Sequence, residues 1–327
     1  MRPQPFSTMT LPRLSSCLFV LGCLLPVARS AAPAIPPPVG PAPTHADVAY
    51  GSGPRNVLDF WQASSPRPTP LVIYIHGGGF MAGDKSGARQ EALLQACLDA
   101  GVSFAAINYS YLSAATPMPV VLHDCARAVQ FLRTKAGEWK LDPRRFAAYG
   151  GSAGAGASLW VAFHPDLAEP NSADPVRRQS SRLACVGAIS TQCSYDPVRW
   201  GELFGDEAVR RYGGTYLSPA LFGFATDEAL RGPAGAAVRA ECDMLGLISP
   251  DDPPVFLEAT GRTLALTTQN QLLHHPRHSR EIFLRCRDLG VPVVAIIPCY
   301  DVRPPAGEPT TLREFVFRQL GVGNPPH

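Results

Sequence analysis

Short apolar runs alternate along this chain with longer segments in which apolar residues recur at helical spacing. A short apolar run bounded by turn-forming residues is typical of a buried strand, and a period of about 3.6 residues is typical of a helix with one buried face. The predicted strands are Ala46–Tyr50, Asn56–Trp61, Leu71–Ile75, Ser103–Asn108, Phe146–Tyr149, Val186–Thr191, Val255–Ala259 and Val293–Ile297. The predicted helices are Ser86–Ala100, a segment from about Pro119, Gly154–Val161, Pro276–Leu289 and a segment opened by Thr311. This alternation predicts an α/β fold in which helices cover both faces of a parallel sheet.

One long segment interrupts the alternation. Residues 196–252, between the sixth and seventh predicted strands, lack a strand pattern and are rich in glycine and aromatic residues. We expect a small cap insertion here. Its aromatic side chains either wall a substrate pocket or pack only on one another.

The amino-terminal residues 1–30 have the pattern of a secretory signal peptide, with Arg2 and Arg13 before an apolar stretch and small residues after it. The protein is therefore expected to be secreted or periplasmic, with no membrane span in the mature chain. A lipid anchor is the weaker alternative. Residues 31–44 contain six prolines and no charged residue. This composition predicts an extended linker ahead of a domain formed by residues 45–327.

Charge and cysteine content exclude some partners and cofactors. The formal net charge of +2 gives no electrostatic reason to expect nucleic-acid binding. Removal of the signal peptide takes away two of the nine cysteines and leaves an odd number, so at least one thiol stays unpaired in a monomer. Cys193 and Cys242 flank the predicted cap and are candidates for a disulfide. The spacing of cysteines and histidines indicates no zinc site, and we expect no cofactor.

The first chemical motif is the Gly-x-Ser-x-Gly pentapeptide of residues 150–154, with Ser152 at its centre. An apolar run precedes it and a helical pattern rich in small residues follows it. This context is typical of a nucleophile elbow, a tight strand-to-helix turn that exposes the serine. The N–H of Ala153 would then face the negative charge that develops on a bound carbonyl oxygen. The alternative is a turn whose small residues serve packing alone.

A second motif lies about 75 residues upstream, where the strand Leu71–Ile75 runs into His76 and three glycines. This is the HGGG type of oxyanion motif, in which side-chain-free loop residues expose their N–H groups. We expect Gly77 and Gly78 to donate to the same oxyanion as Ala153. His76 is interpreted as fixing the loop rather than as an acid or base.

With these motifs the chain resembles the α/β-hydrolases of the hormone-sensitive-lipase and bacterial esterase type. The resemblance runs from about Asn56 to Leu320. Its markers are Leu58-Asp59-Phe60, His76–Phe80 followed by Gly83-Asp84-Lys85, Pro119–Asp124, Tyr149–Gly154 and Pro253–Leu257. The resemblance implies an eight-stranded, mostly parallel sheet. It also implies hydrolysis of small-molecule carboxylic esters by Ser152.

The chain departs from this family where the acid and the histidine of the triad are expected. The acid would fall near residues 262–266, which contain no carboxylate, and the histidine would fall near residues 298–302, which contain no histidine. One hypothesis exchanges the two loops, so that His274 or His275 is the base and Asp301 orients it. Asp196, just past the sixth predicted strand, is a second candidate acid.

Two functional hypotheses follow. In the first, the protein is a serine hydrolase of carboxylic esters with a rearranged triad. In the second, it kept the elbow, lost catalysis and acts as a binding or interaction module. The intact elbow favours the first hypothesis and the missing late histidine favours the second. The sequence indicates no particular oligomeric state.

Overall fold

The computed structural model describes residues 40–323. The predicted signal peptide and residues 31–39 of the predicted linker lie outside this range. The last linker residues contact the domain. The N–H of Gly40 donates to the Arg89 carbonyl at 2.7 Å, and the Trp61 indole donates to the Pro41 carbonyl at 3.0 Å.

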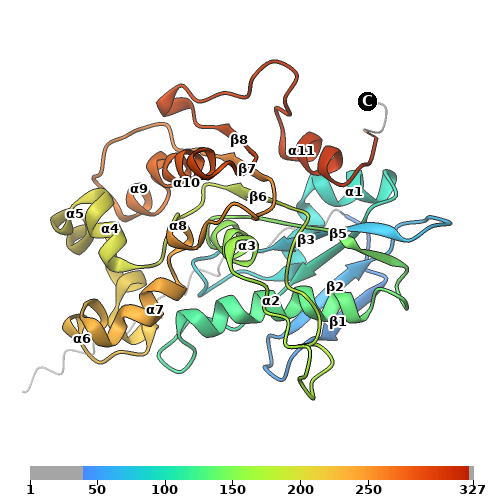
Figure 1. Cartoon of the computed structure of the whole chain (residues 1–327), viewed down its shortest axis with the longest axis horizontal. Helices are drawn as coiled ribbons and strands as arrows, with labels where there is room; N and C mark the ends of the chain where they lie inside the picture. The colour runs from blue at the N-terminus through green and yellow to red at the C-terminus, as the bar shows by residue number, and fades with distance from the viewer. Residues whose placement is uncertain (1–39, 324–327) are drawn as a thin grey trace, which may run out of the picture. The chain divides into compact units, whose positions relative to one another are not determined.

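Eight strands form one sheet in the order β1-β2-β4-β3-β5-β6-β7-β8 (Figure 1). They are β1 (His45–Ala49), β2 (Val57–Trp61), β3 (Thr69–Ile75), β4 (Ser103–Ile107), β5 (Leu141–Gly151), β6 (Cys185–Ile189), β7 (Val255–Glu258) and β8 (Val293–Ile296). The first two strands pair antiparallel, and β3 to β8 run parallel. The predicted α/β class is confirmed. Because the strands are parallel, the loops that follow β3, β5 and β7 leave the sheet at the same edge.

Helices cover both faces of the sheet. One face carries α1 (Ala92–Asp99) and α11 (Leu312–Gln319), which lie next to each other in Figure 1. The opposite face carries α2 (Met118–Thr134), α3 (Ala153–Phe163) and α10 (Pro276–Leu289). Successive side chains of a strand point to opposite faces, so the apolar β3 residues divide between the two layers. Leu71 and Ile73 join the core under α2 and α3, whereas Val72 joins the core under α1 and α11.

The helix predicted over residues 86–100 is wrong in its first half. Residues Lys85–Gln90 form a 3-10 helix, and α1 begins only at Ala92. The reason is Lys85, whose ammonium contacts the carboxylates of Asp47 and Asp59 at 2.8 Å each. Because Asp59 lies on β2, this buried lysine ties the start of the segment to the sheet.

The cap predicted between β6 and β7 is present as a set of short helices (Figure 1, yellow to orange). They are α4 (Pro197–Phe204), α5 (Asp206–Tyr212), α6 (Asp227–Arg231), α7 (Ala236–Glu241) and α8 (Met244–Leu247), with 3-10 turns at Gly214–Leu217, Pro219–Phe222 and Pro233–Gly235. Glu241 attaches α7 to the domain. Its carboxylate contacts His123 of α2 at 3.0 Å and His164 at 3.3 Å, and its carbonyl accepts from the Trp160 indole at 2.7 Å. The two histidine contacts lower the pKa of Glu241 to about 2.

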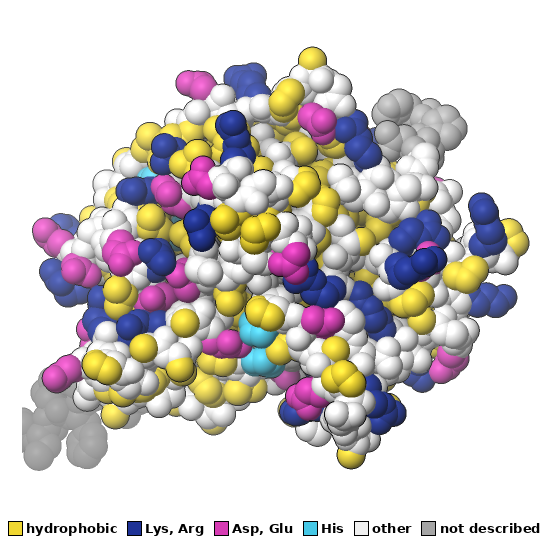
Figure 2. Space-filling model, in the orientation of Figure 1, with side chains coloured by type: hydrophobic (Ala, Val, Ile, Leu, Met, Phe, Trp, Pro, Cys, Tyr) yellow, Lys and Arg dark blue, Asp and Glu magenta, His cyan; other side chains and the backbone are white. Residues whose placement is uncertain are grey.

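The cysteines of the described chain are all free thiols, and six of the seven are buried. The proposed Cys193–Cys242 disulfide is therefore wrong for this structure, and the two side chains pack instead in the apolar core beneath the cap. No helix within residues 40–323 is long and apolar enough to cross a bilayer. On the face shown in Figure 2, acidic and basic side chains are interspersed, in keeping with the small net charge.

Candidate active site

Ser152 stands on a tight turn between β5 and α3. Its backbone has φ 54° and ψ −121°, a conformation that a residue with a side chain rarely adopts. The Ser152 N–H donates to the Ile189 carbonyl at 2.9 Å, which continues the pairing of β5 with β6. Glycine is required on either side, because a Cβ on Gly150 or Gly154 would lie 2.4 or 2.0 Å from the Ile75 carbonyl oxygen. The predicted elbow is thus present, and the sheet holds it in its strained form.

The Ser152 hydroxyl meets an imidazole from the segment after β7. The distance from Ser152 Oγ to His274 Nε2 is 2.8 Å, and the distance from His274 Nδ1 to Asn270 Oδ1 is 2.9 Å. Since an amide oxygen only accepts, the Nδ1 atom carries the proton and Nε2 is free to accept from the serine. Burial lowers the pKa of His274, while a hydrogen bond to the Asn270 backbone opposes this effect. The imidazole is therefore neutral at neutral pH.

The short helix α9 (Gln269–Leu273) places both Asn270 and His274, which are four residues apart and lie on one face. Thr268 caps the helix by accepting from the Gln271 N–H at 3.2 Å. Leu272 is fully buried against Trp200 of the cap, and the Gln192 side chain donates to the Leu273 carbonyl at 2.6 Å. The cap and the loop after β6 therefore hold α9 beside the elbow.

The sequence leaves His275 open as the base, but in the structure its ring binds backbone groups and does not contact Ser152. Its Nδ1 accepts from the Arg277 N–H at 3.1 Å and so caps α10, while its Nε2 lies 3.2 Å from the Leu264 carbonyl oxygen. Both ring nitrogens are occupied by backbone groups. The structure thus pairs Ser152 with His274, and His275 holds the segment that carries it.

The two candidate acids do not reach the imidazole. Asp301 ends a tight turn after β8, closed by backbone hydrogen bonds between Ile297 and Val302, and its exposed carboxylate forms no hydrogen bond or ion pair with a described side chain. Asp196 caps α4 by accepting from the Val198 N–H at 2.8 Å and pairs with Arg239 at 3.5 Å. The hypothesis that Asp301 or Asp196 orients the histidine is therefore wrong for this structure, because neither carboxylate is bonded to His274. Asn270, which no motif singled out, takes the orienting position, and its only sequence signal is the i, i+4 spacing to His274.

The glycine loop after β3 lies over the elbow. Gly78 and Gly79 line the same cavity as Ser152 and Ala153. Gly78 has φ 107°, and its carbonyl accepts from the N–H groups of Met81 and Ala82. Gly77 does not line the cavity but packs on the elbow, where a Cβ would lie 2.8 Å from the Gly151 carbonyl oxygen. Of the two predicted donors, Gly78 thus lines the cavity beside Ser152 and Gly77 does not.

His76 is hydrogen-bonded to the backbone of this glycine loop. Its Nδ1 lies 2.7 Å from the Gly77 carbonyl oxygen, and the Tyr109 hydroxyl donates to the His76 carbonyl at 2.7 Å. The side chain is only 2% exposed, and burial lowers its pKa. A buried, neutral imidazole bonded to the loop backbone is a structural element, as the sequence indicated.

Two cavities meet at Ser152. The first has a volume of about 520 Å³ and is walled by aromatic and apolar side chains, including Phe80, Met118, Trp200 and Tyr216. The second, of about 540 Å³, is lined mainly by residues with polar side chains, and we call it the polar cavity. Both are lined by Ser152, Asn270 and His274. Within residues 40–323, no cluster of His, Cys, Asp and Glu side chains is arranged to hold a metal ion.

Part of the sequence is similar to known esterases. The BD-FAE family model matches residues 58–191. A probable carboxylic ester hydrolase of Mycobacterium tuberculosis is 32% identical over 124 residues, which are 37% of this chain and 28% of that protein. Versiconal hemiacetal acetate esterase of Dothistroma septosporum is 28% identical over 131 residues, 39% of each chain. The matched segment is thus similar to esterases, and the eight-stranded sheet with its helices is the α/β-hydrolase fold.

Solved structures extend the likeness of this α/β-hydrolase beyond the matched segment. An acetyl ester-xyloside bifunctional hydrolase of Caldicellulosiruptor lactoaceticus aligns with 81% of this chain and 88% of its own, at a TM-score of 0.55 and 22% identity. A bifunctional GH43-CE protein of Bacteroides eggerthii aligns with 84% of this chain and 38% of its own, at a TM-score of 0.62 and 16% identity. At these identities the likeness establishes the fold. The chain spans only 26% to 39% of the lengths of the curated relatives that it matches.

Proposed function

We propose that this α/β-hydrolase cleaves carboxylic esters with Ser152 as nucleophile, His274 as general base and Asn270 as the group that orients the base. The observation that carries the proposal is the 2.8 Å contact between Ser152 Oγ and His274 Nε2. It joins an elbow serine to an imidazole whose second nitrogen is already bonded. This is the arrangement that activates a serine hydroxyl.

In the proposed acylation step, Ser152 Oγ attacks the ester carbonyl carbon while its proton passes to His274 Nε2. The carbonyl oxygen becomes an oxyanion facing the N–H groups of Ala153, Gly78 and Gly79, and each such donor contributes roughly 3 kcal/mol to the transition state. The carbonyl then re-forms, the bond to the alcohol oxygen breaks, and His274 gives its proton to the leaving alkoxide. In deacylation, His274 takes a proton from the water that attacks the acyl carbon. The bond between this carbon and Ser152 Oγ then breaks, His274 returns the proton to Ser152 Oγ, and the acid is released.

Asn270 differs from the usual acidic partner because it is neutral. It fixes the Nδ1–H tautomer of His274 but gives the imidazolium no ion pair. We expect Asn270→Asp to raise the pKa of His274, since a carboxylate stabilises the charged ring. The acid limb of the kcat/KM profile against pH should therefore move to higher pH. Asn270→Ala should lower kcat about 10- to 100-fold through loss of tautomer control.

Both variants are measured as pH profiles of turnover, together with thermal unfolding. An exchange that only perturbed packing would lower activity equally at all pH values, and an unmoved acid limb in Asn270→Asp would contradict the role given to this residue.

A serine-directed fluorophosphonate tests the proposed function directly. The protein should take up one equivalent of the reagent on Ser152, located by peptide mass spectrometry, and lose its activity toward short-chain 4-nitrophenyl esters in proportion. Ser152→Ala should neither react nor turn over these esters. A folded protein that is not labelled and hydrolyses none of them would support the non-catalytic alternative.

A further inference from the structure

The polar cavity beside Ser152 is lined by a positively charged side chain, Arg262, in the segment where the family resemblance places an acid. Arg262 lies in the segment after β7 and lines this cavity together with Ser152 and His274. Its side chain is exposed and forms no ion pair or hydrogen bond with another described residue. The lining includes the hydroxyl residues Ser190, Thr260 and Thr263, and it includes no carboxylate. Glu258 lines the adjoining cavity with Arg262, without an ion pair between them.

The proposed chemistry creates positive charge in this same place. In the proposed reaction, Ser152 gives its proton to His274, which becomes an imidazolium. Asn270 is neutral and offers this ring no negative charge. Arg262 adds a second cation to the lining that both share. A substrate that brings its own anion would satisfy the guanidinium and also stabilise the neighbouring imidazolium, because opposite charges a few ångströms apart attract in a partly desolvated site.

We propose that the polar cavity binds a carboxylate carried by the ester substrate, with Arg262 as the residue that recognises it. The inference rests on the proposed ester hydrolysis at Ser152 and specifies its substrate class. The guanidinium has five N–H donors in a planar fork that matches a carboxylate, and the neighbouring hydroxyls supply further donors. The aromatic cavity, which Ser152 also lines, then takes the apolar part of the ester. The two cavities together select an ester with one apolar and one anionic end.

Matched pairs of esters test this selection. The first pair, 4-acetoxybenzoate and its neutral methyl ester, places the charge on the alcohol side. The second pair, 4-nitrophenyl hemisuccinate and 4-nitrophenyl butyrate, places it on the acyl side. We expect Arg262→Ala to lower kcat/KM for the anionic member of at least one pair about tenfold, the lower end for a hydrogen bond between charged groups at an exposed site. The neutral members should change by less than about twofold, and Arg262→Lys should be intermediate because it keeps the charge without the fork.

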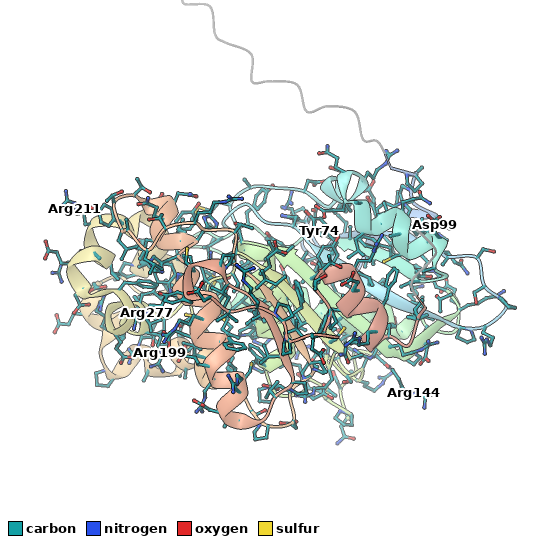
Figure 3. The ribbon with its side chains drawn as sticks, turned by 90° about the horizontal axis from the view of Figure 1, so that it is seen from above. Tyr74, Asp99, Arg144, Arg199, Arg211 and Arg277 are labelled. Atoms are coloured by element: carbon teal, nitrogen blue, oxygen red, sulfur yellow. The ribbon has the colours of Figure 1, made fainter. Side chains whose placement is uncertain are left out.

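The control variant is Arg144→Ala, which changes the net charge equally. Arg144 is 90% exposed on its side chain and lies at the end of the domain away from the cap residues Arg199 and Arg211 (Figure 3). It should leave both pairs unchanged at about 0.15 M salt, where charges farther apart than the screening length barely interact. An equal effect of Arg144→Ala, or equal effects of Arg262→Ala on charged and neutral esters, would overturn the assignment.

A binding measurement separates this inference from the proposed function. Calorimetric titration of Ser152→Ala with 4-hydroxybenzoate requires no turnover and should show binding that Arg262→Ala weakens about tenfold. If neutral esters are hydrolysed but neither the ester pairs nor the titration depends on Arg262, the carboxylate site is wrong and the hydrolase stands. If no ester is hydrolysed, the proposed function fails and, with it, the inference that this cavity serves an ester substrate.

Discussion

Replacing His274 with asparagine is expected to lower kcat for ester hydrolysis by roughly 10³- to 10⁴-fold, whereas the same exchange at His275 leaves kcat within about threefold. The first change removes the imidazole that is bonded to Ser152, and a positioned general base contributes about this much to a proton transfer. The second change keeps a side chain that accepts hydrogen bonds at the start of α10, since asparagine is among the preferred residues there. The measurement is kcat at saturating 4-nitrophenyl ester, with thermal unfolding to show that both variants fold.

This pair of adjacent histidines makes a sharp comparison because the two variants share composition, charge and neighbourhood. The Ser152→Ala variant gives the residual kcat in the absence of the nucleophile. Adding His274→Asn to it should lower kcat little further, since the effects of residues that act as a unit are not additive. Equal losses at His274 and His275 would contradict the assignment of the base, and so would a His274→Asn protein that kept a tenth or more of its turnover.

Replacing Gly78 with valine is expected to lower turnover at least hundredfold. A Cβ at this position would lie 2.2 Å from the Ala82 carbonyl oxygen, and the φ of 107° disfavours any side chain. The glycine loop must therefore move, and with it the N–H donors proposed for the oxyanion, the loss of one of which costs about 10²- to 10³-fold in kcat. The expected readout is a fall in kcat for neutral esters that exceeds any change in thermal stability.

The control for this variant is Gly101→Val. Gly101 also has a positive φ, of 72°, but a Cβ there would meet no atom within 4 Å. Both variants carry the strain of a branched residue in the left-handed region, and only Gly78→Val displaces the loop beside Ser152. If the two proteins lose activity equally, the loss comes from backbone strain alone and the oxyanion role of the glycine loop is wrong.

The sequence predicted the fold and the elbow because both depend on local signals. Apolar runs gave the strands, and Gly150, Ser152 and Gly154 form a short motif whose geometry follows from the absence of side chains. Choosing between His274 and His275 was beyond the sequence, since neighbouring residues point in different directions and only the docking of α9 decides which ring meets the serine. Asn270 was missed because an amide bonded to a histidine has no motif. Gly79 was missed because the identity of the exposed N–H groups depends on φ values that three consecutive glycines do not reveal.

Helix α9 contains the proposed orienting amide, and the proposed base is the residue that ends this helix. In an arrangement with acid and base on separate loops, each group could shift alone and activity would decline in stages. Here Asn270 and His274 keep their mutual distance wherever the helix goes, because the helix itself sets it, while Ser152 belongs to the rigid sheet. The proposed catalytic centre thus joins one part fixed to the sheet with one part carried by α9. Its geometry depends on how α9 packs, and this packing is fixed by the hydrogen bond from Gln192 and by the buried cluster of Leu272 and Trp200.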